Sequence, residues 1–167
     1  MVWLSEASCS IDDFVATVEQ TTKPGDYPHA ARVEQGAVVY DSSDLRDGMT
    51  ALGADRVLMS EIASALSGGP GIVVFTHALD HDIVDQASVE FQAIIDAERS
   101  TAATGGDHFA KPGANDRIWN ALQKLAERNP NVFVDYYAND IIALAAQSWL
   151  GPNYQVTSQV NVVNPGG

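Results

Sequence analysis

The chain has 167 residues, one cysteine, 46% hydrophobic residues and 19% charged residues. This length suits one domain or a piece of one, and the apolar fraction is normal for a protein with a packed core. Nine basic against 22 acidic residues give a net charge of −13, which disfavours nucleic-acid binding because such a surface repels phosphates. The lone Cys9 can form no internal disulfide, and the first residues lack the basic start and apolar run of a signal peptide, so we expect a cytoplasmic protein.

The amino-terminal part predicts two helices with one short strand between them. The first helix begins at Ser10, whose spacing to Asp13 resembles a capping box, and should stop near Lys23-Pro24-Gly25. Between 26 and 53 the run Val38-Val39-Tyr40 predicts a strand, while Asp41 to Asp44 and Gly48 indicate turns. The apolar residues at helical spacing are Ile11, Phe14, Val15 and Val18 in the first helix and Val57, Leu58, Ile62, Ala65 and Leu66 in the second.

A strand followed by a helix is the clearest local unit of the sequence. The run Ile72-Val73-Val74-Phe75 is apolar and rich in β-branched residues, so it predicts a strand buried on both faces. Residues 62–79 carry no charge, but Gly68-Gly69-Pro70-Gly71 interrupts them, so we expect no membrane span. The helix that follows is capped by Asp80 or His81 and has its apolar residues at Ile83, Val84, Ala87, Phe91, Ile94 and Ile95.

After a loop over 100–114 the sequence again predicts helices. Beyond these helices the spacing of apolar residues changes from helical to the alternation typical of a strand. Asn115 is expected to cap a helix that turns Ile118, Leu122 and Leu125 inward. Asn129-Pro130 starts another, and helical spacing continues to Gly151-Pro152. Beyond it the polar residues Gln155, Thr157, Gln159 and Asn161 alternate with Val156, Ser158, Val160 and Val162, which predicts a strand with one polar face.

Positive charge is concentrated in one stretch of this acidic chain. Residues 1–98 hold 17 acids and four bases, whereas residues 99–128 hold five bases and three acids, a net of +2. A locally basic region on an acidic protein favours an anionic ligand group. The alternative is that Arg117, Lys124 and Arg128 form the solvated face of a helix.

The sequence contains no evident catalytic constellation. There is no Gly-x-Ser-x-Gly elbow, the glycine-rich run at 68–71 lacks the lysine of a phosphate-binding loop, and Cys9 has no neighbouring histidine. His77 and His81 are four residues apart but fall at a strand end and a helix start, so helical metal-ligand spacing does not apply. His108 suits either a local hydrogen bond or a functional contact. We therefore assign no catalytic residue and no metal ligand.

Two segments resemble a known family. Gly71-Ile72-Val73-Val74-Phe75, followed by a helix and then by Gly106-Asp107-His108-Phe109, resembles the N-terminal part of the phytanoyl-CoA dioxygenase family. The stretch from Trp149-Leu150-Gly151-Pro152 to Asn164-Pro165-Gly166-Gly167 is similar to it in its order of helix, Leu-Gly-Pro, strand and Pro-Gly turn. Members are non-haem Fe(II)/2-oxoglutarate-dependent oxygenases built on a double-stranded β-helix.

The resemblance implies an α+β fold class: the helix-rich N-terminal portion of a jelly-roll oxygenase with an incomplete sheet, as a single-domain fragment over 1–167. In that family two histidines and a carboxylate hold the iron, and their His-x-Asp pair follows the strand with which this sequence ends. No His-x-Asp occurs here, so we expect a fragment that is inactive alone and binds neither Fe(II) nor 2-oxoglutarate tightly. The complete enzyme would hydroxylate a small-molecule substrate.

Four residues are candidates for co-substrate binding through this resemblance. Gln159 and Asn161 match the cavity-facing strand of the family, and Thr157 shares their face. Lys111 in the 105–113 loop is a candidate because family members use a lysine upstream of this strand for the co-substrate. The alternative is an exposed or internally paired strand face. A second hypothesis for the chain is a non-catalytic acidic α+β module that binds a partner or dimerises, since an unpaired strand edge favours self-association.

Overall fold

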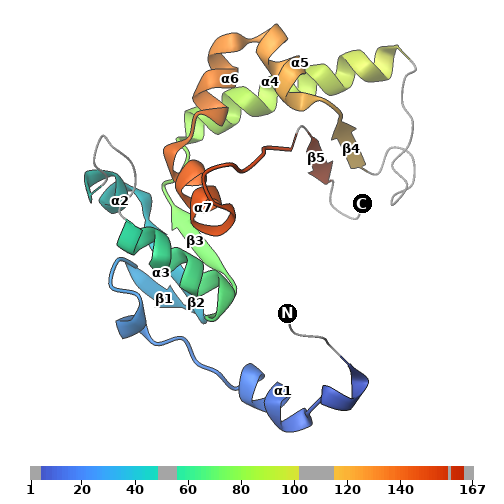
Figure 1. Ribbon diagram of the computed structural model, residues 1–167. Helices are drawn as coiled ribbons and strands as arrows, with labels where there is room; N and C mark the ends of the chain where they lie inside the picture. Colours follow the sequence, from blue (N-terminus) through green and yellow to red (C-terminus); the bar gives the residue numbers. More distant parts are fainter. Residues whose placement is uncertain (1–4, 49–55, 102–114, 158, 164–167) are drawn as a thin grey trace. The chain divides into compact units, whose positions relative to one another are not determined.

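The computed structural model describes residues 5–48, 56–101, 115–157 and 159–163, and the account below is confined to them. Helices and short strands follow one another in the helix-rich α+β arrangement that the sequence predicts (Figure 1). The chain divides into two compact units, Met1–Thr76 (unit 1) and His77–Gly167 (unit 2), which are described separately. The expectation of a single domain stays a prediction. Within the described ranges, no helix is long and apolar enough to cross a bilayer.

Unit 1 contains a three-stranded sheet with β2 in its centre. β1 (Arg32–Glu34) and β2 (Ala37–Asp41) are antiparallel neighbours, and β3 (Val73–Thr76) pairs with β2 in parallel. α2 (Ser42–Gly48) and α3 (Arg56–Ser67) connect the two parallel strands. The buried apolar side chains of this unit are Tyr27, Val38, Val39, Tyr40, Leu45, Leu58, Ile62 and Ala65.

The first helix, α1 (Ile11–Val18), begins where the sequence predicts. The Ser10 side chain accepts a hydrogen bond from the Asp13 backbone N–H at 3.2 Å and so caps it. The 3-10 turns η1 (Glu6–Ser8) and η2 (Pro24–Asp26) precede and follow it. Its apolar side chains stay exposed, with Phe14 at 62% and Val18 at 60%. The Ser10 cap therefore determines where α1 begins, although none of the residues of α1 is buried.

The turns predicted at Asp41 to Asp44 and at Gly48 are wrong, because Asp41 ends β2 and Ser42–Gly48 form α2. The Asp41 carboxylate accepts a hydrogen bond from the Ser43 backbone N–H at 2.9 Å, so turn-forming residues serve here to start a helix. Leu45 anchors that helix in the core. β1 has no counterpart among the predicted elements; positive φ angles at Gln35 and Gly36 make the tight two-residue turn that joins it to β2.

α3 and β3 confirm the predicted helix and strand, but the expected burial of both strand faces is wrong. Val74 is 39% exposed, and Ile72, just before the strand, is 53% exposed. Among the described residues β3 pairs with β2 alone, so it is an edge strand of this sheet. A continuous apolar run therefore did not distinguish an edge strand from a central one.

Unit 2 is built around α4 (His81–Ser100), against which α5 (Ala121–Arg128) and α6 (Pro130–Tyr137) pack (Figure 1). Asp80 caps α4 by accepting a hydrogen bond from the Asp82 backbone N–H. Between these elements lies one apolar core, made by Ala87, Phe91, Ile94, Ile95, Ile118, Ala121, Leu125 and Val132. β4 (Asn115–Ile118) and β5 (Val160–Val163) form an antiparallel pair, and the β5 valines Val160 and Val162 pack against this core.

Two predictions in unit 2 need correction. Asn115 does not cap a helix: residues 115–118 form β4, in which Ile118 lies opposite Val160, a pairing that local spacing does not reveal. The strand predicted over 155–162 is shorter and later, at 160–163, so Thr157 and Gln159 precede it. Within β5 the predicted alternation is confirmed, because Asn161 is exposed while its neighbours on either side are half-buried.

The start of α6 and the end of α7 lie at the predicted signals, but the break between these two helices was not predicted. Asn129 caps α6, with its side-chain oxygen accepting a hydrogen bond from the Val132 backbone N–H. α7 (Asp140–Leu150) starts afresh after Asn139, which accepts a hydrogen bond from Ile142. It ends at Gly151, whose φ of 81° lies in the region that favours glycine.

Candidate functional site

Of the four residues predicted to bind the co-substrate, Asn161 alone lies in a described strand. Gln159 and Thr157 are on the segment before β5, and all three side chains are exposed. Lys111, like His108 and the rest of the 105–113 loop, lies outside the described residues. A solvated strand face and a cavity wall completed by other residues would both show this exposure, so exposure alone does not separate the two roles.

Asn161 lies opposite Arg117 of β4, and the two side chains are in contact. The Arg117 Nε–H donates a hydrogen bond to Asn161 Oδ1 at 2.8 Å, and the guanidinium carbon lies 5.4 Å from the ring centroid of Trp119. Contact with an amide and an aromatic ring orients a planar cation, which is the group best suited to bind a carboxylate. Sequence reasoning missed this role of Arg117 because it placed the residue on a helix.

The basic residues predicted to attract an anion are largely paired with carboxylates of the protein. Arg99 donates to both carboxylate oxygens of Asp116 at 2.8 Å. Lys124 pairs with Glu98, and the Arg128 Nε–H donates to Glu90 at 2.5 Å. Glu90 and Glu98 lie on α4, outside the window 99–128, so the net charge of that window overstates the positive charge available there.

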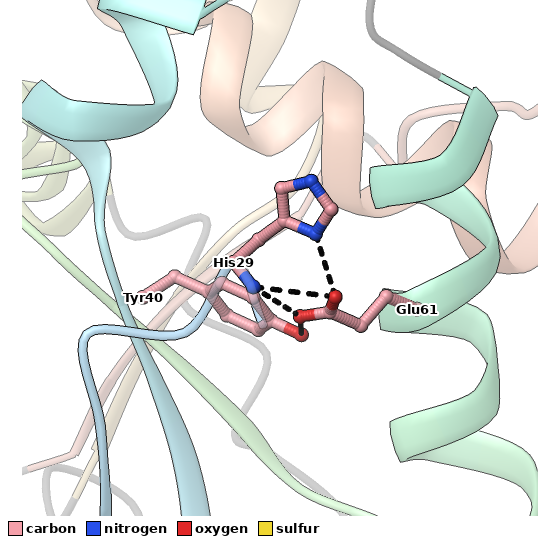
Figure 2. Close-up of polar contacts among 3 residues, drawn as sticks. All are labelled: His29, Tyr40 and Glu61. Atoms are coloured by element: carbon pink, nitrogen blue, oxygen red, sulfur yellow. Dashed lines mark hydrogen bonds and ion pairs between the residues drawn. The ribbon is translucent and has the colours of Figure 1, made fainter. Parts of the chain in front are cut away.

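A buried carboxylate in unit 1 forms a polar cluster with His29 and Tyr40 (Figure 2). Glu61 of α3 has a side chain only 6% exposed. Its Oε2 lies 2.6 Å from His29 Nδ1, and both of its oxygens accept from the His29 backbone N–H at 3.3 Å. The Tyr40 hydroxyl of β2 donates to Oε1 at 3.1 Å. One carboxylate thus ties the 27–30 loop, β2 and α3 together.

The cluster also fixes the chemistry of its members. The contact between His29 Nδ1 and the carboxylate fixes the orientation of the imidazole ring. Burial, followed by the nearby Glu61 charge, raises the pKa of Tyr40 well above its usual range, so its hydroxyl stays a donor. Stacking on Phe75, with centroids 5.4 Å apart, holds the ring in place. His29 lines neither of the two cavities of unit 1 given below, and its contacts with Glu61 fasten the 27–30 loop to α3.

The sequence did hold a signal for this carboxylate. Glu61 lies on the same helical stripe as Leu58, Ile62 and Ala65, all of which are buried. A charged residue on an apolar stripe predicts a buried partner. His29 provides that partner.

Unit 1 also contains a groove, whose lining includes Asp26 and Tyr27 of the 24–30 turn. It has a volume of about 820 Å³ and is bounded by residues 16–17 and 19–23, Asp26, Tyr27, residues 35–37 at the β1–β2 turn, residues 68–70 and Ile72. A second cavity of about 310 Å³ shares Asp26, Tyr27, Gly68 and Gly69 with it. We call the two together the Tyr27 groove.

Among the described residues, no three metal-ligating side chains come together. Comparison of the chain with protein-family models, curated proteins and solved structures finds no match.

Proposed function

We propose that this chain is the helix-rich part of a non-haem Fe(II)/2-oxoglutarate-dependent oxygenase of the phytanoyl-CoA dioxygenase family, with a jelly-roll fold. The motif order of the sequence motivates the proposal. The observation that supports it best is the exposed side of the β4–β5 pair, where Asn161 and Arg117 present an amide and a guanidinium together. On this proposal the side is one wall of a cavity for the co-substrate.

The residues at hand do not fit the iron itself. The sequence has no His-x-Asp, and the described part of the chain gathers no set of three ligands. We therefore assign no step at the metal to this chain. Its proposed contribution is the binding of a 2-oxoglutarate carboxylate by Arg117, oriented by Asn161 and Trp119.

The test is an assay of the reading frame continued past the Gly167 codon. With Fe(II) supplied, the product should convert 2-oxoglutarate to succinate. Arg117→Gln should raise the KM for 2-oxoglutarate about tenfold, since a charge-assisted hydrogen bond contributes about 1.5–3 kcal/mol. Arg128→Gln is the matched control, because Arg128 lies on α5 and not on the β4–β5 pair, so its loss should leave that KM unchanged. Failure of the continued product to bind or turn over 2-oxoglutarate would refute the proposal.

The alternative, an acidic binding or dimerisation module, rests on a different observation. β3 is an edge strand among the described residues, with Val74 39% exposed and no charged residue beside it. Natural edges of this kind are protected by lysine or by a covering element, and an unprotected one favours pairing with a second copy. Light scattering should then show a dimer that Val74→Lys dissociates, whereas Val89→Lys on α4, where Val89 is 69% exposed, should leave it intact. A monomer at all concentrations would exclude this alternative.

A further inference from the structure

We propose that the Tyr27 groove of unit 1 binds a small aliphatic amine through its ammonium group. Its larger cavity, about 820 Å³, falls in the size range of small-molecule sites. The proposal concerns a part of the chain that the oxygenase proposal does not use, so each can fail without the other.

A tyrosine hydroxyl without a partner belongs to the lining of the groove. The Tyr27 side chain is 91% buried, yet its hydroxyl forms no hydrogen bond with any described residue. That hydroxyl lies against Gly69, where an added Cβ would collide with it. Because Tyr27 and Gly69 line both cavities, the hydroxyl lies where the two meet. Ser42 Oγ is the fully buried side-chain atom without a partner among the described residues, so the Tyr27 hydroxyl is open to the groove and free to bond a ligand there.

The backbone around Tyr27 is fixed in advance. Its N–H donates to the Pro24 carbonyl at 3.1 Å, and its own carbonyl accepts from the Ala30 N–H at 3.0 Å. Two residues further on, His29 is fastened to Glu61. The opposite wall is joined to the β1–β2 turn by the Thr22 hydroxyl, which donates to the Gly36 carbonyl at 2.6 Å. The backbone that lines the groove is therefore already held in place before a ligand binds. This favours affinity because little conformational entropy is lost on binding.

The charges of the lining select a cation. Glu19 and Asp26 contribute to it, and neither forms an ion pair with a described residue. Lys23 is the one basic residue in the lining, so carboxylates outnumber cations there. Phosphate-bearing ligands are disfavoured by this balance and by the net charge of −13, which instead raises the local concentration of cations. The hydroxyl-rich remainder, with Thr17 and Thr21, suits the other hydrogens of an ammonium group.

Titration of the full chain at low salt with 1,4-diaminobutane, followed by NMR or calorimetry, tests the proposal. We expect the diamine to shift the groove residues and the neutral analogue 1,4-butanediol not to bind. Asp26→Asn should weaken diamine binding about tenfold, the usual effect of losing a hydrogen bond to a charged group. Asp12→Asn removes the same charge from the exposed start of α1, outside the groove, and should leave affinity within about twofold.

Three results would overturn the proposal: no diamine binding up to about 10 mM, equal binding of the diol, or equal weakening by the two aspartate variants. The last would mean that the acidic surface attracts amines without a site. If Asp26→Asn fails to fold, Glu19→Gln replaces it, since Glu19 is exposed and its substitution disturbs no core contact. That variant should weaken binding by about threefold, against no change in Asp12→Asn.

Discussion

Both units fasten a helix to its neighbours with carboxylates, but in opposite surroundings. In unit 1, the Glu61 side chain is 6% exposed and meets a tyrosine hydroxyl, a backbone N–H and an imidazole. In unit 2, Glu90 and Glu98 of α4 meet the cations Arg128 and Lys124, whose side chains are 46% and 34% exposed. The first arrangement is one buried junction, and the second is a row of separate surface pairs.

The difference teaches where each unit is vulnerable. Removing one member of a buried polar cluster leaves its partners without solvent or protein to bond, so the loss is large and insensitive to salt. Surface pairs in water contribute little each and are screened by salt, and the apolar core under α4 carries the stability there. The stability of unit 1 therefore depends strongly on Glu61, whereas no single carboxylate of the surface pairs has this importance in unit 2.

The largest effect is expected from Glu61→Ala. It should lower the free energy of unfolding of unit 1 by about 3 kcal/mol, because the Tyr40 hydroxyl and the His29 N–H lose their acceptor inside the protein. Hydrogen exchange of the α3 amides measures this. Glu34→Ala is the control, since Glu34 is 57% exposed in its pair with Arg32 and should change stability by less than about 0.5 kcal/mol. Equal losses in the two variants would mean that the cluster is not a junction.

Alkaline pH provides the next contrast. Burial, then Glu61, raises the pKa of Tyr40 above its unfolded value of 10.0, so the contribution to stability is complete below pH 10 and is lost as pH rises beyond it. The loss should approach about 1.4 kcal/mol per pH unit. Tyr40→Phe should be less stable than the wild type at pH 7, by about 1 kcal/mol for the missing hydrogen bond, and the gap should narrow above pH 10. Parallel urea-unfolding curves at every pH would contradict this.

Unit 2 offers a matching alkaline test. Burial, then Tyr136, also raises the pKa of Tyr137, but no carboxylate accepts from its hydroxyl among the described contacts. Tyr137→Phe should therefore reduce the loss of α6 stability above pH 10. The alkaline loss of stability measured at α3 should stay the same as in the wild type.

How far the sequence predicted this structure depends on the range of the interaction involved. Caps at Ser10, Asp80 and Asn129 are contacts over two or three residues, so the helix starts they define were predictable. β4 was mistaken for a helix because its identity depends on β5, far along the chain. The same holds for chemistry: Asn161 was named through the family resemblance of its strand, whereas its contact with Arg117 follows only from the pairing of the two strands.

The same limit explains the sites that the sequence missed. Glu61 gave a local signal, a charge on an apolar stripe, but its partners His29 and Tyr40 come from a loop and a strand that only folding brings to it. The Tyr27 groove is bounded by four separate stretches of sequence, none of which is unusual alone. Residue type predicts what a side chain can do, and tertiary contacts decide which other side chain it meets.

The smallest effect is expected at low pH, at the surface pairs of unit 2. Hydrogen bonds from Asn129 and Arg128 lower the pKa of Glu90 below its ordinary value of 4.5. A lowered pKa in the folded state stabilises the protein above pH 4.5, and this contribution is lost as pH falls through the folded value. The difference in free energy of unfolding between Glu90→Gln and the wild type should therefore become smaller as pH falls. At pH 7, 1 M salt should reduce the same difference. Because 22 acidic residues titrate in this chain, the informative quantity is the difference between variant and wild type at each pH, measured by urea unfolding. If the difference in unfolding free energy between Glu90→Gln and the wild type did not change with salt, Glu90 would behave like the buried Glu61. The contrast between the two units would then be wrong.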